Sequence, residues 1–410
     1  MTLVFQSMPH AVSVSIGLWV KMGSRYETDE ERGYTHFLEH MLFKGTEKRT
    51  AKEQARDIER VGGFLNAVTT REYTYFYVTL IKDKVELGME FLSDMIFRPL
   101  LNESDIQNEA QVIVEEIKSY EDSPDEFVYD YFYRNIFSNS NLGLDITGTK
   151  KSVLSVNSEK LKKFYKKNYH SGQMILSVSG DLSSSEVEDL AKKYFHKKEN
   201  NSIVQVQPEK LKKTFDVFIK ERKEVEQINF IIGAEGFPRE IGSLVRQSLF
   251  NTVFGGGMSS RLFQKIREDH GLCYSISAYS GSYKDTGITS ISCATSPDRF
   301  LKCVDYILEE IRAILKDGIT EKELEDAKSN QVGSLAIGFE VPEHRMVSIA
   351  LQELYFGKYY SFEDRKEMIN SVKLGEISEL SKKIYSLDKL HLSLVGNLGE
   401  SITKKISVSI

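Results

Sequence analysis

Hydrophobic and polar positions change their spacing along the chain, and each change predicts an element of secondary structure. Residues 12–20 alternate apolar and polar side chains, which predicts a half-buried strand. Residues 103–120 place apolar side chains three and four positions apart, which predicts a helix with one buried face. The same criteria predict helices at 33–43, 51–61 and 84–95 and strands at 65–70, 73–81 and 173–179.

The order of these elements repeats in the second half of the chain. Strands are predicted at 227–233 and 286–294, and helices at 262–269 and 300–315, in the order of their counterparts. Glu321 stands at the start of a helical pattern 218 positions after Glu103, which starts the pattern of the first half. This repeat indicates internal duplication. We predict an α+β fold of two homologous α/β domains, each a mostly antiparallel sheet with helices packed on one face.

A polar, lysine-rich stretch that contains Pro208 separates the two halves. A chain of 410 residues is too long for one compact core and suits two domains. We predict an N-terminal domain at 1–200, a linker at 201–214 and a C-terminal domain at 215–410. Only a short lead, 1–8, precedes the first alternating run, so we expect a shortened edge strand there or a start that lies further upstream.

Composition narrows the classes of function. Hydrophobic residues make up 40% of the chain and charged residues 28%, as in ordinary globular proteins, and the net charge of −6 with dispersed basic residues argues against nucleic acid as a partner. No apolar run is long enough to span a bilayer, and the N-terminus lacks the pattern of a signal peptide. The three cysteines, Cys273, Cys293 and Cys303, form no C-x-x-C pair and are expected to be buried reduced thiols. A reducing compartment, the cytoplasm, follows as an expectation.

The segment 36–40, His-Phe-Leu-Glu-His, is the strongest candidate for a functional site in the chain. His36 and His40 are four apart on a predicted helix, so both imidazoles lie on one face and can share a metal ion. Glu39 lies beside the same point without having to be a ligand. The H-x-x-E-H pattern is the inverted form of the H-E-x-x-H motif of zinc peptidases.

A hydrolytic zinc site uses three protein ligands and keeps one position open. Glu109 and Glu116 are seven apart on the predicted helix 103–120 and therefore project from the same side. An isolated Glu most often belongs to a solvated helix face. Because Glu116 is flanked by the apolar Val114 and Ile117, and because two histidines need a third ligand, we favour a metal site.

A longer stretch, 33–46 (GYTHFLEHMLFKGT), resembles the signature of the pitrilysin-type zinc peptidases, the inverzincins. Segments 23–27 (GSRYE), 62–67 (GGFLNA) and 112–117 (VIVEEI) are similar to that family too. The resemblance covers essentially the whole chain and is greatest for the processing-peptidase branch, which holds the mitochondrial processing peptidase and its short bacterial relatives.

This resemblance implies a set of roles within the first half. His36, His40 and Glu116 would bind one Zn²⁺ per chain, Glu39 would be the general base, and Glu109 would be a second acidic residue behind the metal. A peptide would pair with strand 65–70 through backbone groups around Asn66 and Ala67.

The second half lacks the metal-binding residues. Residues 244–254 stand where the metal helix should be and contain neither His nor Glu, and Ala327 and Ser334 replace Glu109 and Glu116. The resemblance implies that the second half assists catalysis. In the family an Arg and a Tyr seven positions apart reach the active site, and Arg267 and Tyr274 match them here. A guanidinium and a phenol suit the oxyanion of a tetrahedral intermediate. The alternatives are a surface charge and a core aromatic, and Arg261 is a second candidate.

Other sequence patterns give weaker evidence of function. The run Gly255-Gly256-Gly257 lacks the Lys-Ser/Thr ending of a phosphate loop and indicates a flexible turn. The aromatic stripe at 127–137 indicates core packing or a pocket wall.

We therefore expect a zinc metalloendopeptidase that hydrolyses short or unfolded peptides. In the family two chains of about this length enclose a chamber, so we expect a homodimer, with a heterodimer as the alternative. A non-catalytic core or assembly subunit and a peptide-binding clamp with structural zinc are the rival functions.

Overall fold

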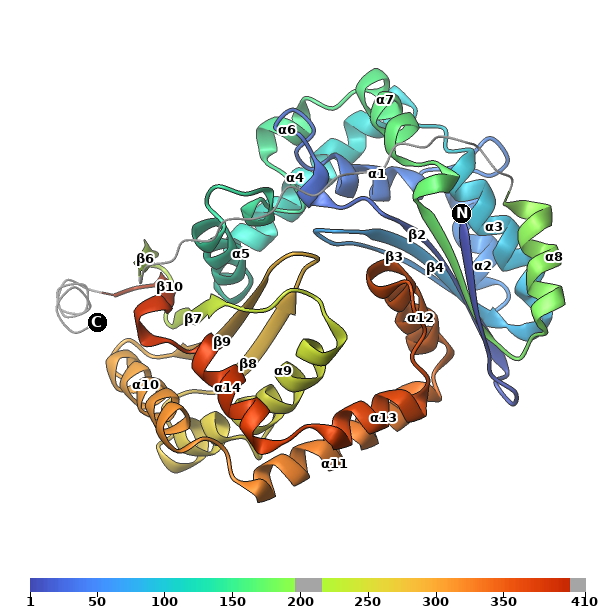
Figure 1. Ribbon diagram of the computed structural model, residues 1–410. Coiled ribbons are helices and arrows are strands. Elements are labelled where there is room, and N and C mark those ends of the chain that lie inside the picture. The colour runs from blue at the N-terminus through green and yellow to red at the C-terminus, as the bar shows by residue number, and fades with distance from the viewer. Residues whose placement is uncertain (196–215, 399–410) are drawn as a thin grey trace. The chain divides into compact units, whose positions relative to one another are not determined.

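The computed structural model describes residues 1–195 and 216–398; the predicted linker 201–214 lies outside the described residues. The chain folds into two compact units (Figure 1). Their described residues are 1–118, 144–195 and 336–360 in the first unit, and 119–143, 216–335 and 361–398 in the second.

The first unit is built on a five-stranded sheet in the order β1-β5-β2-β4-β3. β1 runs parallel to β5, and the other neighbours are antiparallel. The strands are β1 (Thr2–Ser7), β2 (Ser13–Val20), β3 (Phe64–Thr69), β4 (Thr74–Ile81) and β5 (Met174–Gly180). The short lead thus forms a six-residue edge strand that pairs with β5 along its whole length.

The second unit repeats this topology, with the order β6-β10-β7-β9-β8 and a parallel pair at the same edge. Its strands are β6 (Asp216–Glu221), β7 (Ile228–Glu235), β8 (Ser275–Ser282), β9 (Gly287–Thr295) and β10 (His391–Gly396). The identical strand order confirms the α+β fold of two homologous, mostly antiparallel units that the sequence predicted.

Helices cover one face of each sheet and enclose its main core. In the first unit these are α1 (Tyr34–Leu42), α2 (Ala51–Glu59), α3 (Val85–Phe97), α4 (Glu103–Asp122), α6 (Lys150–Leu154), α7 (Ser158–Asn168) and α8 (Ser184–Tyr194). In the second they are α9 (Ile241–Phe254), α10 (Phe300–Asp317), α11 (Glu321–Phe339), α13 (Phe362–Ser371) and α14 (Leu374–Ile384). The predicted helix 262–269 is a π-helical turn, Phe263–Asp269.

The opposite face of each sheet carries one further helix that the linear domain boundaries did not foresee. α5 (Pro124–Ile136) packs on β7 and β10 of the second unit, and α12 (Pro342–Phe356) packs on β1, β2 and β5 of the first. Pro124 and Pro342 both stand at the first turn of their helix and are 218 positions apart, so the two helices are counterparts in the duplication. Each unit therefore takes this helix from the other half of the sequence.

Glycines in the central strands allow the two exchanged helices to approach closely. A Cβ on Gly17 of β2 would lie 2.3 Å from the sulfur of Met346, and one on Gly233 of β7 would lie 2.6 Å from the Phe132 ring. A side chain at either position would have to displace Met346 or Phe132, so glycine is favoured where each helix crosses the sheet. The aromatic stripe 127–137 is core packing, as predicted, since Phe127, Phe132 and Phe137 are buried against the second sheet.

The three cysteines come together in the second unit. Cys293 and Cys303 are buried, with their sulfurs 3.5 Å apart, whereas Cys273 is half-buried. None of the three forms a disulfide, and the half-burial of Cys273 corrects the expectation that all three are fully buried. Among the described helices, none is long and apolar enough to cross a membrane.

Candidate metal centre

Helix α1 presents two imidazoles to a common point in the first unit. It begins after Gly33, whose φ of +83° is favourable only for glycine, and its apolar side is buried in the core through Phe37, Leu38 and Met41. The other side carries His36 and His40, whose rings lie 4.5 Å apart between centroids. The four-residue spacing thus brings the imidazoles together, as the sequence predicted.

Glu116 on α4 completes a group of three potential ligands. Its carboxylate oxygens lie 3.7 Å from Nε2 of His36 and 3.5 Å from Nε2 of His40. Ligand atoms about 2.0–2.1 Å from a tetrahedral zinc are about 3.4 Å apart, so these three side chains already have nearly the spacing that the metal needs. In the part of the chain that the structure describes, no other group of His, Cys, Asp or Glu converges in this way.

Protonation favours metal binding at His36. Burial, together with the neighbouring charge of His40, lowers the pKa of His36 to about 3, although Glu109 opposes this shift. The imidazole is therefore neutral at physiological pH, and a neutral imidazole is the form that binds a metal.

Glu109 supports His40 from behind. Nδ1 of His40 lies 2.8 Å from one oxygen of Glu109, and Lys44 contacts the other at 2.5 Å. Burial disfavours the charged form of His40, but the hydrogen bond to Glu109 and the charge of Glu116 outweigh it and raise the pKa of His40. Burial also disfavours the charged form of Glu109, but the hydrogen bonds to His40 and Lys44 outweigh it and lower the pKa of Glu109. A carboxylate on Nδ1 fixes the tautomer and directs Nε2 toward the metal position.

Glu39 lies beside this position without joining the ligand group. Its carboxylate accepts a short hydrogen bond from the hydroxyl of Thr69, at the end of β3. Burial raises the pKa of Glu39, although the Thr69 hydrogen bond and His40 act in the opposite direction. A carboxyl group whose pKa is shifted toward neutrality is suited to taking and returning a proton.

Glu27 fixes the start of the metal helix. Its two oxygens accept the backbone N–H groups of Gly33 and Thr35 at 2.8 and 2.6 Å, which takes the place of a side-chain N-cap. Burial is the main cause that raises the pKa of Glu27 to about 8, against the effect of these hydrogen bonds. Glu27 thereby sets the position of the turn that carries His36.

Family models match both halves of the chain. Residues 2–150 match the model described as Insulinase (Peptidase family M16), and residues 155–331 match the Peptidase M16 inactive domain. The chain belongs to peptidase family M16. The inactive-domain match begins within the first unit and covers most of the second, and among the described residues of the second unit no group of metal-binding side chains converges.

Bacterial relatives extend the M16 match over almost the full length. The chain is 34% identical to the uncharacterized zinc protease YmxG of Bacillus subtilis over 94% of each chain. It is also 34% identical to an uncharacterized zinc protease of Rickettsia felis, over 94% of this chain and 93% of the relative.

Solved structures share the M16 fold at lower identity. A protease from Helicobacter pylori is 19% identical, covers 96% of each chain and has a TM-score of 0.89. A peptidase M16 inactive domain from Pseudomonas fluorescens is 18% identical, with coverage of 96% and 95% and a TM-score of 0.90.

The arginine and tyrosine expected to assist catalysis belong to the inactive-domain unit of this M16 chain. Arg267 lies over the rings of Phe263 and Tyr274, at 4.6 and 5.1 Å from their centroids, and 79% of the Tyr274 surface is exposed. Neither side chain is buried in a core, so the phenol is accessible. Arg261, the second candidate, instead forms two hydrogen bonds to Glu323 at 2.6 and 2.7 Å and is engaged in its own unit.

Sequence reasoning missed three residues that shape the M16 site. Lys44 lies two positions beyond the end of α1, where helical spacing no longer applies, and contacts Glu109 of α4. Thr69 and Glu27 come from other elements and carry no local signal that points to the metal helix. Only the packing of β3 and of the segment before α1 reveals them.

Proposed function

We propose that this M16 protein is a zinc-dependent endopeptidase of short or unfolded peptides, with one Zn²⁺ held per chain by His36, His40 and Glu116. The convergence of these three side chains at near-tetrahedral spacing carries the proposal. A bound zinc ion would supply a Lewis acid for the scissile carbonyl and would acidify a water molecule.

Glu39 acts as the proton carrier in this proposal. Its carboxylate takes the proton of the attacking water and passes it to the nitrogen of the leaving amine. The hydrogen bond from Thr69 keeps one oxygen of Glu39 in place, so that the other can face the water. Glu109 holds the ring of His40 in the tautomer that leaves Nε2 free for the metal.

Peptide capture is assigned to the free edge of β3. β3 is the last strand of its sheet, and Phe64 is half exposed there. The backbone N–H of Ala67 donates to the side-chain oxygen of Asn66 at 2.9 Å. In this proposal the side chain of Asn66 holds the N–H in the place that a backbone carbonyl of the peptide would take. A peptide that pairs with this edge needs an extended backbone, which folded proteins rarely present.

Arg267 and Tyr274 are assigned to the oxyanion of the tetrahedral intermediate, in a homodimer in which the inactive-domain unit of one protomer serves the metal unit of its partner. The exposure of Tyr274 supports a role outside its own core. A heterodimer with a related subunit is the alternative. Three free thiols support a reducing compartment, such as the cytoplasm, as the place of action.

A quenched peptide library tests the peptidase proposal. Zinc-loaded wild-type protein should cleave it, and a chelator should abolish cleavage until zinc is restored. Glu39→Gln should bind zinc normally and lose at least about a hundredfold in kcat, because proton transfer contributes about 10²–10⁴ in rate. Wild-type protein that binds zinc but leaves the library intact would defeat the proposal and favour a binding or assembly role.

A further inference from the structure

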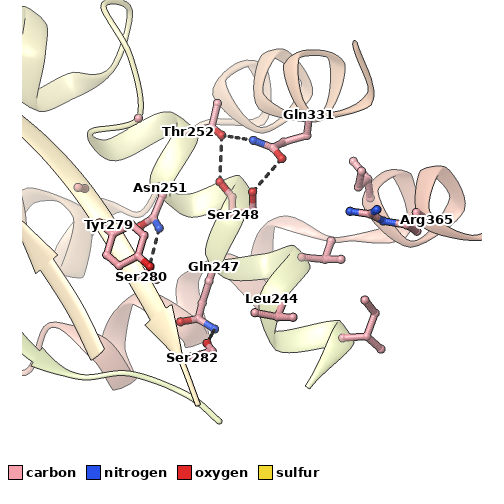
Figure 2. A pocket seen from close by; sticks show the side chains of 15 residues that line it. Leu244, Gln247, Ser248, Asn251, Thr252, Tyr279, Ser280, Ser282, Gln331 and Arg365 are labelled. Atoms are coloured by element: carbon pink, nitrogen blue, oxygen red, sulfur yellow. Dashed lines mark hydrogen bonds between the residues drawn. The ribbon is translucent and has the colours of Figure 1, made fainter. Parts of the chain in front are cut away.

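Strand β8 of the second unit lines a pocket with its second half and has a group of thiols near its start. The pocket lies between α9, β8 and α11 (Figure 2). On its wall Ser248 donates to Gln331 at 2.8 Å, and Gln331 donates to Thr252 at 2.7 Å, so these polar groups are paired with one another. The thiols at the other end of the strand are nucleophilic side chains that the proposed function does not use.

Three segments bring these thiols together. Cys273 stands two positions before β8, Cys293 lies on β9, and Cys303 lies on α10. The sulfurs of Cys293 and Cys303 are 3.5 Å apart, and both thiols form hydrogen bonds with the sulfur of Cys273. Cys293 and Cys303 are 5% and 0% exposed, whereas Cys273 is half-buried. One accessible thiol therefore contacts two buried ones.

Hydrogen bonds hold the turn that carries Cys273. The carbonyl of Leu272 accepts a hydrogen bond from the hydroxyl of Thr295 at 2.5 Å. The carbonyl of Gly271 accepts one from the guanidinium of Arg299 at 2.8 Å. Thr295 ends β9 and Arg299 stands directly before α10, so the turn is attached to the two elements that carry the buried thiols.

The surroundings of the three thiols favour ionisation of Cys273. Hydrogen bonds from Cys293 and then from Cys303 lower the pKa of Cys273, against the effect of burial. The positive charge of Arg267 acts in the same direction as these hydrogen bonds. The contact with Cys273 is the first cause that raises the pKa of each buried thiol. Because the thiolate is the nucleophilic form of cysteine, reactivity is concentrated on the thiol that solvent reaches.

We propose that Cys273 is a site of oxidation by hydroperoxides and that this oxidation ends in a disulfide with one of the two buried thiols. The thiolate sulfur attacks one oxygen of hydrogen peroxide and the O–O bond breaks, which leaves a sulfenic acid on Cys273. The other oxygen departs as hydroxide and becomes water with the proton that Cys273 had released.

A buried thiol completes the reaction. The sulfur of Cys293 or Cys303 attacks the sulfenic sulfur, the S–O bond breaks, and a second water leaves with the proton of the attacking thiol. The two thiols lose two electrons in total, and one peroxide molecule accepts them. The oxidation needs neither zinc nor Glu39, so it goes beyond the proposed hydrolysis.

The disulfide acts on the residue that follows Cys273. Tyr274 is 79% exposed, and its ring lies 5.1 Å from the guanidinium carbon of Arg267. A covalent bond is shorter than the hydrogen bond that it replaces, so it draws Cys273 toward the core and shifts the phenol of Tyr274. A loss of peptide cleavage by this shift rests on the proposed function of Tyr274, whereas formation of the disulfide does not.

Thiol mapping tests the oxidation site on the full-length, zinc-loaded protein. After hydrogen peroxide and then iodoacetamide, mass spectrometry of a non-reduced digest should show Cys273 joined to Cys293 or Cys303. The number of free thiols should fall from three to one. Before oxidation, iodoacetamide should modify Cys273 at least about tenfold faster than either buried thiol. A disulfide between Cys293 and Cys303, or a Cys273 that keeps its thiol under peroxide, would overturn the proposal.

Matched variants separate the two steps. Cys273→Ser should keep both remaining thiols under the same treatment, because both are buried. The double variant Cys293→Ala/Cys303→Ala should react more slowly and stop at the sulfenic acid of Cys273, which dimedone traps. Loss of the buried thiols of Cys273→Ser at the wild-type rate would overturn the proposal. Thermal unfolding midpoints show whether the variants are folded, and if one is not, the mapping on wild-type protein still decides.

The peptide library tests the effect on Tyr274. The oxidised protein should keep its zinc, lose at least about tenfold in kcat and recover with a thiol reductant, because one oxyanion donor is displaced. Folded Cys273→Ser should cleave the library equally before and after peroxide. Full activity of the disulfide form would overturn the effect on Tyr274. A library that stays intact in every sample would instead contradict the proposed hydrolysis, and the thiol mapping would still decide on the oxidation site.

Discussion

Nδ1 of His40 lies 2.8 Å from a carboxylate oxygen of Glu109, a residue 69 positions away on another helix. Nε2 of the same ring is turned toward Glu116, 3.5 Å away. One imidazole therefore joins a supporting carboxylate to a candidate ligand, which is the arrangement that orients metal-binding histidines.

Replacing Glu109 should weaken zinc binding without removing a ligand. Glu109→Gln removes a charge that holds His40 and Lys44, and loss of such an outer carboxylate costs about 10–100-fold in metal affinity. Competition with a fluorescent chelator measures the change in the zinc dissociation constant. Unchanged affinity would show that the His40 ring is held by the rest of the core instead.

Two adjacent glutamates should differ sharply in their effect on zinc. Glu116 faces both imidazoles, whereas the side chain of Glu115 is 69% exposed and pairs with Lys118 on the same helix. Glu116→Gln should reduce bound zinc below one ion per chain after dialysis, measured by atomic absorption, while Glu115→Gln should keep it. The pair is matched in chemistry and position, so an equal loss would assign the effect to helix α4 rather than to coordination.

The stability of the protein should depend on the ionisation of Glu27. Its folded pKa of about 8 is above the usual value of 4.5, so the folded chain keeps a proton that the unfolded chain releases between these two values. This contribution to stability is complete below about pH 4.5 and is lost as pH rises toward about 8, with a slope of at most about 1.4 kcal/mol per pH unit.

Urea unfolding at several pH values, with a chelator present, checks this dependence. Glu27→Gln cannot titrate, so its unfolding free energy should fall less steeply than that of wild-type protein between pH 5 and pH 8. Glu59→Gln changes an exposed glutamate of α2 that does not act on Glu27, and should keep the wild-type slope. Parallel curves for wild-type protein and Glu27→Gln would contradict the assignment.

Activity of mixed dimers should reveal whether Tyr274 acts across protomers. Glu39→Gln and Tyr274→Phe should each be nearly inactive alone. In a mixed dimer, the metal unit of the Tyr274→Phe chain faces the intact Tyr274 of its partner, so an equal mixture should recover about a quarter of wild-type activity.

Light scattering should first establish that the protein is a dimer and that subunits exchange. Recovery on mixing would be incompatible with a site built within one chain, because each chain of the mixture lacks one group. A stable, active monomer, or exchanged dimers with no recovered activity, would contradict the proposed assembly. Lys265→Gln, which removes a charge next to the same turn, serves as the control for general disturbance.

The local sequence pattern was sufficient to predict the position of a side chain where that position depends only on the helix that carries it. The spacing of His36 and His40 placed both imidazoles on one face, and the duplication predicted the shared strand order of the two sheets. Helical spacing also placed Glu109 and Glu116 on one side of α4. The pairing of that helix with α1 was supplied by resemblance to a family and by the need for a third ligand, not by the pattern.

The exchange of α5 and α12 between units could not be read from the chain. Both helices are amphipathic, and either sheet offers an apolar second face, so the sequence pattern does not say which sheet each one covers. The fit of Met346 over Gly17 and of Phe132 over Gly233 depends on the surfaces that form only once the sheets are assembled. Shape complementarity between distant segments settled the choice.

By itself, the sequence determined the secondary structure and the duplication, because these depend on periods of two and 3.6 residues. It also brought His36 and His40 to one helix face, whereas Glu116 was added as the third ligand by resemblance to a family. Only the tertiary structure decided which groups support the candidate site: Thr69 on Glu39, Glu27 at the start of α1, and Lys44 on Glu109. Those contacts join atoms from segments far apart in the chain, and burial, which a linear pattern does not measure, sets their protonation and their need for partners.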